Sequence, residues 1–292
     1  MSQASAQQIT SELRDWIVAQ AQAGHGPEAV LKSMIASGWS EVVAIDAMEA
    51  TLADHLAADP NRRVPPAAAL VPAAVPVPDA ALADSPLYLD AADRRVHVVA
   101  SMTSPRIIVL GNLLSADECD LLIAAATPRL ARSLTVATKT GGEEINIDRT
   151  SNGMFFGRCE SPLIARIEER IATLFGWPVE NGEGLQVLHY RPGAEYKPHH
   201  DYFSPEEPGT ASLLSRGGQR VATLIMYLNE PENGGATVFP DVHLSVAPKR
   251  GHAVFFSYDR PHADTKTLHG GAPVIAGEKW IATKWLRECE FA

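Results

Sequence analysis

Short strand-like segments separated by turn signals fill the second half of the chain, and they limit the fold more than any other feature. From Leu185 onward, β-branched and aromatic residues gather in short runs, a composition typical of β-strands. Turns such as Arg-Pro-Gly and Asn-Gly-Gly separate these runs. Short strands in series with tight turns between them predict a sandwich or jelly roll. The expected strands are LQVLHY, RVATLIMYL, ATVF, HLSVA, HAVFFS and KWIATKW.

Two amphipathic helices are expected before this strand-rich region. Ser115 can cap a helix that carries apolar residues at positions 121–123. A second helix is expected over residues 162–175, because isoleucines recur there at helical spacing. Together with the strands, these signals predict a mainly β domain with flanking helices.

The N-terminal residues have a different, helical pattern. Leu13 and Ile17 recur at helical spacing, and Pro27 is expected at the first position of a second helix. Gly38 is a stop signal, and a third apolar stripe follows it. Three short helices have only a small core, and we assign residues 1–58 to this three-helix module.

A proline-rich segment follows the helices. Seven of the 21 prolines lie from Pro60 to Pro86, interleaved with alanine and valine. Proline fixes φ and lacks an amide donor, so an extended, semi-rigid linker without a core is expected. The predicted organisation is a helical module over 1–58, a Pro/Ala-rich linker over 59–86 and a catalytic domain over 87–292.

Composition limits the partners and the compartment. Lys and Arg total 25 against 35 Asp and Glu, a formal net charge of −10, which disfavours nucleic-acid binding because phosphates require clustered cations. No apolar run has the length that a bilayer requires, and the first residues do not have the pattern of a secretory signal. Three widely spaced cysteines do not suggest a disulfide framework. A cytoplasmic protein with no membrane partner is therefore expected.

The segment YKPHHDYF, at positions 196–203, has the pattern of a metal site. Alternate side chains of a strand share a face, so His199 and Asp201 are expected to point one way and His200 the other. A third ligand must come from elsewhere, and His269 is placed near the end of the strand-rich region. Two histidines and one carboxylate form the facial triad of non-haem Fe(II) oxygenases.

A lysine completes a site for a keto acid. Lys279 lies ten residues after His269 and opens the expected strand KWIATKW, in which Lys279, Thr283 and Trp285 share a face. A cation at this position can pair with the distal carboxylate of 2-oxoglutarate, and such charge-assisted contacts are strong.

These motifs carry a family resemblance. The chain from about Pro105 onward resembles the catalytic domain of the prolyl 4-hydroxylases, within the 2-oxoglutarate/Fe(II) dioxygenase superfamily. The matching segments stand in this order: RTSNGMFF, LQVLHYRPGAEYKPHHDYF, GGQRVATLIMYLNEPENGGATVFP, GHAVFF and TLHGGAPVIAGEKWIATKWLRE. The resemblance implies a double-stranded β-helix, a jelly roll of two antiparallel sheets flanked by helices.

The resemblance also implies roles for individual residues. His199, Asp201 and His269 would hold iron, and Lys279 would bind the distal carboxylate of 2-oxoglutarate. Tyr190 and Thr223 would hydrogen-bond in the same pocket, although Tyr190, Thr223 and Trp285 could each be a core residue of the barrel. The residues implied near the substrate are Trp285, Arg149 and Tyr196.

Two polar segments could close over a substrate as catalytic loops do. They span residues 137–148 and 204–219 and are rich in Gly, Pro, Ser and Thr. Solvated loops without a function are the alternative.

We therefore expect an Fe(II) enzyme that consumes 2-oxoglutarate and O₂, hydroxylates proline in a peptide or protein at C4, and releases succinate and CO₂. Ascorbate is a possible further cofactor. One alternative is a hydroxylase of a free amino acid or another small molecule. Another is a partner-binding protein with a vestigial barrel. The sequence does not specify the oligomeric state.

Overall fold

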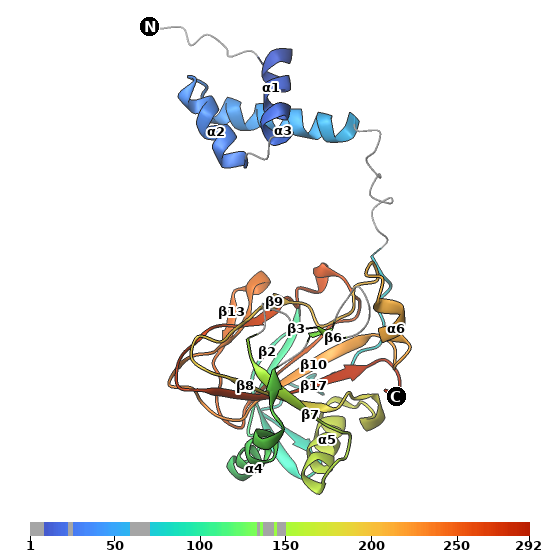
Figure 1. Ribbon diagram of the computed structural model, residues 1–292. Helices are drawn as coiled ribbons and strands as arrows, with labels where there is room; N and C mark the ends of the chain where they lie inside the picture. Colours follow the sequence, from blue (N-terminus) through green and yellow to red (C-terminus); the bar gives the residue numbers. More distant parts are fainter. Residues whose placement is uncertain (1–8, 23–25, 59–70, 133–134, 137–142, 145–149) are drawn as a thin grey trace. The chain divides into compact units, whose positions relative to one another are not determined.

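The computed structural model describes residues 9–22, 26–58, 71–132, 135–136, 143–144 and 150–292. The chain divides into two compact units, Met1–Val71 and Pro72–Ala292 (Figure 1). None of the helices described combines the length and the apolar character needed to span a bilayer.

The first unit contains the three predicted helices. They are α1 (Ser11–Gln22), α2 (Pro27–Ala36) and α3 (Glu41–Ala58). Pro27 occupies the start of α2, where its missing N–H costs nothing, and Gly38 follows the end of α2 with a φ of +93°. The small core of this unit consists of Ile17, Val30, Met34, Ala44, Ala47 and Met48.

The second unit is built on two antiparallel sheets. The order in the large sheet is β1-β2-β3-β14-β10-β17-β8-β7-β4, and the order in the small sheet is β13-β12-β15-β9. The strands of the large sheet are β1 (Tyr88–Ala91), β2 (Arg94–Met102), β3 (Arg106–Gly111), β14 (Ala253–Ser257), β10 (Arg220–Tyr227), β17 (Lys279–Arg287), β8 (Leu185–Tyr190), β7 (Asn152–Phe156) and β4 (Ala131–Arg132). Those of the small sheet are β13 (Leu244–Val246), β12 (Thr237–Phe239), β15 (His269–Gly271) and β9 (Tyr196–His199).

Two short pairs add to these sheets, β11 (Asn233–Gly234) with β16 (Val274–Ala276) and β5 (Thr135–Val136) with β6 (Glu143–Glu144). The predicted jelly roll with flanking helices is confirmed.

Helices cover one face of the large sheet. Helices α4 (Ala116–Ala126) and α5 (Pro162–Phe175) lie together on the side away from β9 and β13 (Figure 1). Ser115 begins α4 as predicted, in a capping box with Glu118. Helix α6 (Thr210–Leu214) is shorter and lies in the second of the two polar segments. The described part of this unit also contains four 3₁₀ turns: η1 (Thr127–Arg129), η2 (Val179–Asn181), η3 (Pro240–Val242) and η4 (Ala263–Thr265).

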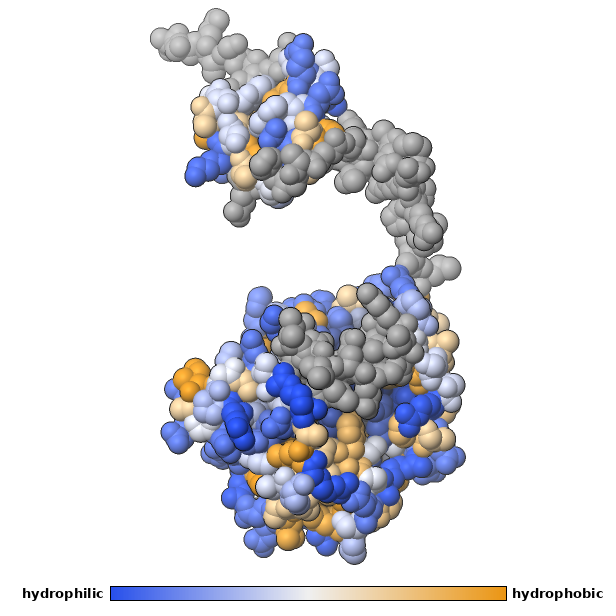
Figure 2. Space-filling view, viewed as in Figure 1, coloured by the Kyte–Doolittle hydropathy of each residue, from blue (hydrophilic) through white to orange (hydrophobic). Residues whose placement is uncertain are grey.

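Alternation along the strands divides the interior into two cores. In β10, Ala222, Leu224 and Met226 pack on the helix side, whereas Ile225 and Tyr227 belong to the core between the sheets. Burying apolar side chains of this size stabilises a fold by about 1.5–3 kcal/mol each. Thr223 faces the same side as Ile225, so a polar side chain enters the space between the sheets. On the visible surface, hydrophobic and hydrophilic residues are interspersed (Figure 2).

The proline-rich segment differs in part from the prediction. Residues 59–70 lie outside the described residues, but the compact second unit begins at Pro72, within the expected linker. Val75 donates its amide to Asp259 O at 2.8 Å, and Ala80 is buried in the core on the helix side. Small residues such as alanine fit against a core without an amphipathic pattern, which is why the sequence did not indicate this packing.

Candidate active site

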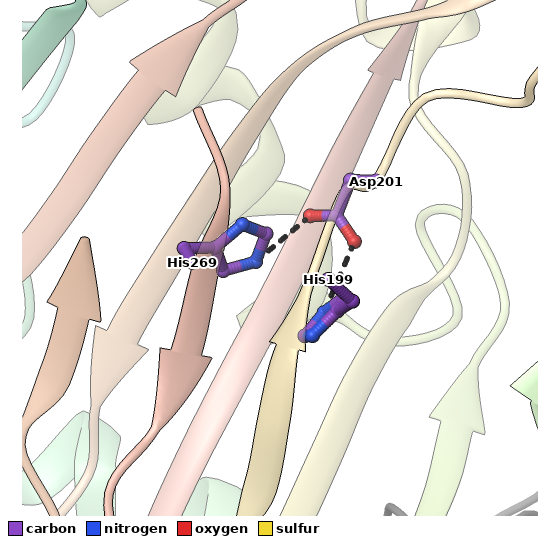
Figure 3. A group of neighbouring side chains, drawn as sticks. All are labelled: His199, Asp201 and His269. Carbon is purple, nitrogen blue, oxygen red and sulfur yellow. Dashed lines mark ion pairs between the residues drawn. The ribbon is translucent and has the colours of Figure 1, made fainter. Parts of the chain in front are cut away.

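The small sheet brings the three predicted metal ligands together. His199 at the end of β9 and His269 at the start of β15 are register partners. The Asp201 carboxylate lies between them (Figure 3). Its Oδ1 is 3.6 Å from His199 Nε2, and its Oδ2 is 3.4 Å from His269 Nε2. Ligand atoms of the three residues all lie within 4.8 Å of one another, and theirs is the one such group of three or more found in the described part of the chain.

The local backbone at Asp201 differs from the predicted strand. Strand β9 ends at His199, and Asp201 lies in a bend that follows it. The two side chains still converge, while His200 stacks on Tyr202 with 4.7 Å between ring centroids. His200 is therefore not part of the ligand group.

Backbone carbonyls orient both histidines of the group. His199 Nδ1 lies 2.8 Å from Lys197 O, and His269 Nδ1 lies 3.0 Å from Thr267 O. A carbonyl only accepts a hydrogen bond, so each Nδ1 donates, and Nε2 is the ring nitrogen that faces Asp201 and is available to a metal. Metal-binding histidines are commonly held by such a contact at the other ring nitrogen.

Two hydroxyl groups orient the carboxylate. Thr223 Oγ1 donates to Asp201 Oδ2 at 2.7 Å and lies 3.0 Å from Tyr258 Oη. The single proton of Thr223 is used on the carboxylate, so Tyr258 must donate to Thr223. The chain of donors thus runs from Tyr258 through Thr223 to Asp201, and we call it the hydroxyl relay.

The charge state of Asp201 suits a cation site. Burial opposes its ionisation, but His269, His199 and Arg220, together with the hydrogen bond from Thr223, hold the pKa of the carboxyl below its ordinary value. Asp201 is therefore a carboxylate even though it is buried. Two imidazole Nε2 atoms and one carboxylate on a single side fit Fe(II) in the geometry of the facial triad.

Lys279 lies in the same cavity as the ligand group. Its side chain is buried, and burial lowers its pKa to about 8. Within the described residues, no carboxylate lies at ion-pair distance from Lys279 Nζ. The ring centres of Tyr190 and Tyr227 lie 5.5 and 5.9 Å from this atom. A buried cation with no counter-charge from the protein is suited to an anionic ligand.

Strand β17 supplies one wall of this cavity. Lys279, Thr283 and Trp285 all line it, as the alternation of the strand predicted. Lys284 faces the other side and pairs with Glu168 of α5. The free volume of this cavity is about 40 Å³.

The other predicted residues have mixed outcomes. Tyr190, Thr223 and Tyr196 line the cavity with the ligand group, and Thr223 contacts Asp201 rather than Lys279. Arg149 lies outside the described residues, as does most of the polar segment 137–148.

Four contributing residues were not predicted, among them Arg220, whose charge helps to lower the pKa of Asp201. Tyr258 begins the hydroxyl relay, and Tyr227 donates to Thr237, a residue of the cavity wall, at 2.8 Å. The alternation of β10 could have indicated Tyr227, which shares a face with Thr223. Tyr258 and Thr237 come from separate elements, and only the fold brings them here.

Comparison with known proteins agrees with this geometry. Residues 185–287 match the family model described as the 2OG-Fe(II) oxygenase superfamily. Prolyl 4-hydroxylase 5 of Arabidopsis thaliana is 41% identical over 220 residues, covering 68% of this chain and 73% of the relative. Prolyl 4-hydroxylase 1 of the same plant is 46% identical over 203 residues, covering 63% and 70%.

A solved structure also matches. The 2OG complex of the viral collagen prolyl hydroxylase from Paramecium Bursaria Chlorella virus-1 is 31% identical, with a TM-score of 0.48, covering 62% of this chain and 95% of that one.

A jelly roll with two histidines, one aspartate and a buried lysine in one cavity defines a 2-oxoglutarate- and Fe(II)-dependent oxygenase. Among these enzymes, the chain belongs to the prolyl 4-hydroxylase family.

Proposed function

We propose that this protein hydroxylates C4 of proline within a peptide or protein, with Fe(II) held by His199, Asp201 and His269. Iron bound there with 2-oxoglutarate and O₂ supplies the oxidising chemistry. One oxygen atom of O₂ enters proline, the other enters succinate, and CO₂ is released. Ascorbate would serve to return oxidised iron to Fe(II). The cytoplasmic location stays a prediction from the sequence.

The observation that carries this proposal is the buried Lys279 ammonium in the cavity of the ligand group, which has no carboxylate partner among the residues that the structure describes. It would bind the distal carboxylate of 2-oxoglutarate, and the hydroxyl relay would keep Asp201 facing the metal. The complete set of donors argues against a partner-binding protein with a vestigial barrel. Such a protein has no need to bury Lys279 without a counter-charge, because that arrangement costs stability.

Trp285 supports a peptide as the substrate. Its indole Nε1 is buried and has no hydrogen-bond partner among the residues described, while Trp285 lines the cavity. A peptide carbonyl would satisfy this donor, and the aromatic face would pack against a proline ring.

The direct test incubates the protein with Fe(II), 2-oxoglutarate, O₂ and either proline-containing peptides or free proline. Mass spectrometry should find one added oxygen on peptidyl proline, and hydrolysis should release 4-hydroxyproline. Succinate should form in equal amount. Hydroxylation of free proline without any on peptides would favour the small-molecule alternative.

A further inference from the structure

A second cavity of about 550 Å³ lies beside the catalytic one. It is formed where β7 and β17 end, where β10 begins and where the segment containing α6 passes. Arg220 lines this cavity and Trp285 lines the catalytic cavity. The Arg220 guanidinium carbon lies 4.1 Å from the centre of the Trp285 ring, so the two side chains form the wall between the cavities. We call the second cavity the arginine groove.

The arginine groove carries an excess of positive charge. Arg158, Arg216, Arg220 and Arg287 line it, and Glu183 is the one carboxylate side chain among its lining residues. This excess contrasts with the formal charge of −10 on the whole chain.

Two of these arginines share the single carboxylate. Arg220 forms a bidentate pair with Glu183 at 2.6 and 2.8 Å, and Arg287 Nε lies 3.1 Å from the same side chain. Glu183 can neutralise only one of them. Burial lowers the pKa of Arg287 to about 10, partly opposed by Glu183, and the nearby Arg220 and Arg216 lower it further. Among its lining residues the groove thus holds two inner guanidinium groups against one carboxylate side chain, and the Asp201 carboxylate of the neighbouring cavity offsets part of the Arg220 charge.

The other two arginines lie at the rim. Arg158 donates to the carbonyl of Glu180, and Arg216 donates to a terminal oxygen of Ala292 and stacks on Phe291. The contact of Arg158 is with a neutral carbonyl, so its charge is retained for a ligand, whereas Arg216 already lies 3.1 Å from a terminal oxygen at Ala292. Phe155 and Phe203 add apolar walls to the groove.

We propose that the arginine groove is a specificity subsite for an acidic residue of the substrate peptide, flanking the proline that enters the catalytic cavity. This inference rests on the proposed function. Guanidinium groups are suited to carboxylates, and aromatic walls are suited to the peptide's apolar atoms. An extended peptide advances about 3 Å per residue, so the acidic residue would lie within a few positions of the reactive proline.

The test uses Ala/Pro peptides in which one position on either side of the proline is Glu or Gln. The ratio of kcat/KM between each Glu peptide and its Gln partner should reach up to roughly fivefold at the best position, because an exposed ion pair contributes up to about that much. The ratio should fall as NaCl rises, since salt screens rim charges. In the double variant Arg158→Gln, Arg216→Gln it should fall substantially toward one. Arg95→Gln, an exposed arginine on β2, is the matched control and should keep the wild-type ratio.

Binding of the same peptides, measured by fluorescence anisotropy, separates the two hypotheses. Arginine-dependent preference for Glu peptides without any hydroxylation would support the groove and reject the proposed function. Hydroxylation at equal rates for Glu and Gln peptides, or a preference that survives in the double variant, would overturn the groove while the proposed function stands.

Discussion

Each histidine of the ligand group is oriented by the backbone carbonyl two residues before it. His199 and His269 use Lys197 O and Thr267 O, so their tautomers depend on main-chain geometry rather than on a replaceable side chain. His200, the neighbour of His199, has no such contact, and its buried Nδ1 has no hydrogen-bond partner in the described part of the chain.

The two adjacent histidines should therefore respond differently to substitution. His199→Ala removes one of three ligands and should abolish iron binding and 2-oxoglutarate turnover. His200→Ala should retain most of both, because that ring stacks on Tyr202 instead. Iron content and succinate formation measure the difference, and equal loss in the two variants would reject the assignment.

The hydroxyl relay should tune iron affinity. Tyr258→Phe removes the donor to Thr223 and leaves a buried hydroxyl only partly satisfied, which loosens the orientation of Asp201. Loss of such contacts around metal ligands weakens binding by about 10- to 100-fold, so the dissociation constant for Fe(II) should rise by about tenfold. Tyr227→Phe is the control, because its hydroxyl contacts Thr237 rather than the ligand group. An unchanged iron affinity in Tyr258→Phe would show that the relay has no role.

Lys279 should determine the requirement for 2-oxoglutarate. Removing one partner of a buried charge pair costs about 2–5 kcal/mol, so Lys279→Ala should raise the KM for 2-oxoglutarate at least about thirtyfold while iron content stays near normal. Lys279→Arg should recover only part of this loss, because the guanidinium is wider and planar. An unchanged KM in Lys279→Ala would place the carboxylate elsewhere.

The same residue predicts a pH dependence. The pKa of Lys279 is lowered to about 8, so the ammonium is present below that pH and is lost above it. The KM for 2-oxoglutarate should be flat below pH 8 and rise above it, because only the protonated amine pairs with the carboxylate. A KM that does not change up to pH 9 would contradict this assignment of the charge.

Strand periodicity explains how much of the site the sequence could predict. The face of β17 that carries Lys279, Thr283 and Trp285 follows directly from alternation, and His199 pairs with His269 across two strands of one sheet. The contact of Thr223 with Asp201 could not be predicted. It depends on how the two sheets pack, and a single sequence does not encode that packing as a local pattern.

The segment Pro72–Pro86 shows a limit of composition at the scale of an element. It was expected to be part of a linker, but it packs on the second unit through Ala80, the Val75 amide and an ion pair of Asp79 with Arg106 at 2.7 Å. A proline-rich composition predicts an extended backbone but not whether that backbone has a surface to lie on.

Two N-terminal truncations test this packing. A protein that begins at Pro72 should be as stable to denaturant as the second unit of the full chain. One that begins at Leu87 should lose about 1–3 kcal/mol of unfolding free energy, because it lacks the hydrogen bonds and buried side chains of residues 72–86. Equal stability of the two proteins would restore the linker interpretation for these residues.

At the scale of the whole molecule, every residue that lines the catalytic cavity belongs to the second unit. A protein of residues 72–292 should therefore decarboxylate 2-oxoglutarate at a rate within about twofold of the full chain, since independent units keep their own cores. Succinate release measures this, and loss of iron or of turnover in the truncated protein would make the helical unit part of the catalytic machinery.

The fate of molecular oxygen tests the central claim most directly. The reaction is run under ¹⁸O₂ with a proline-containing peptide and 2-oxoglutarate, and both products are analysed by mass spectrometry. The account predicts one ¹⁸O atom in the hydroxyproline and one in succinate, with neither product formed by the His199→Ala variant. Hydroxyproline whose oxygen comes from water, or labelled succinate formed equally well without His199, would contradict it.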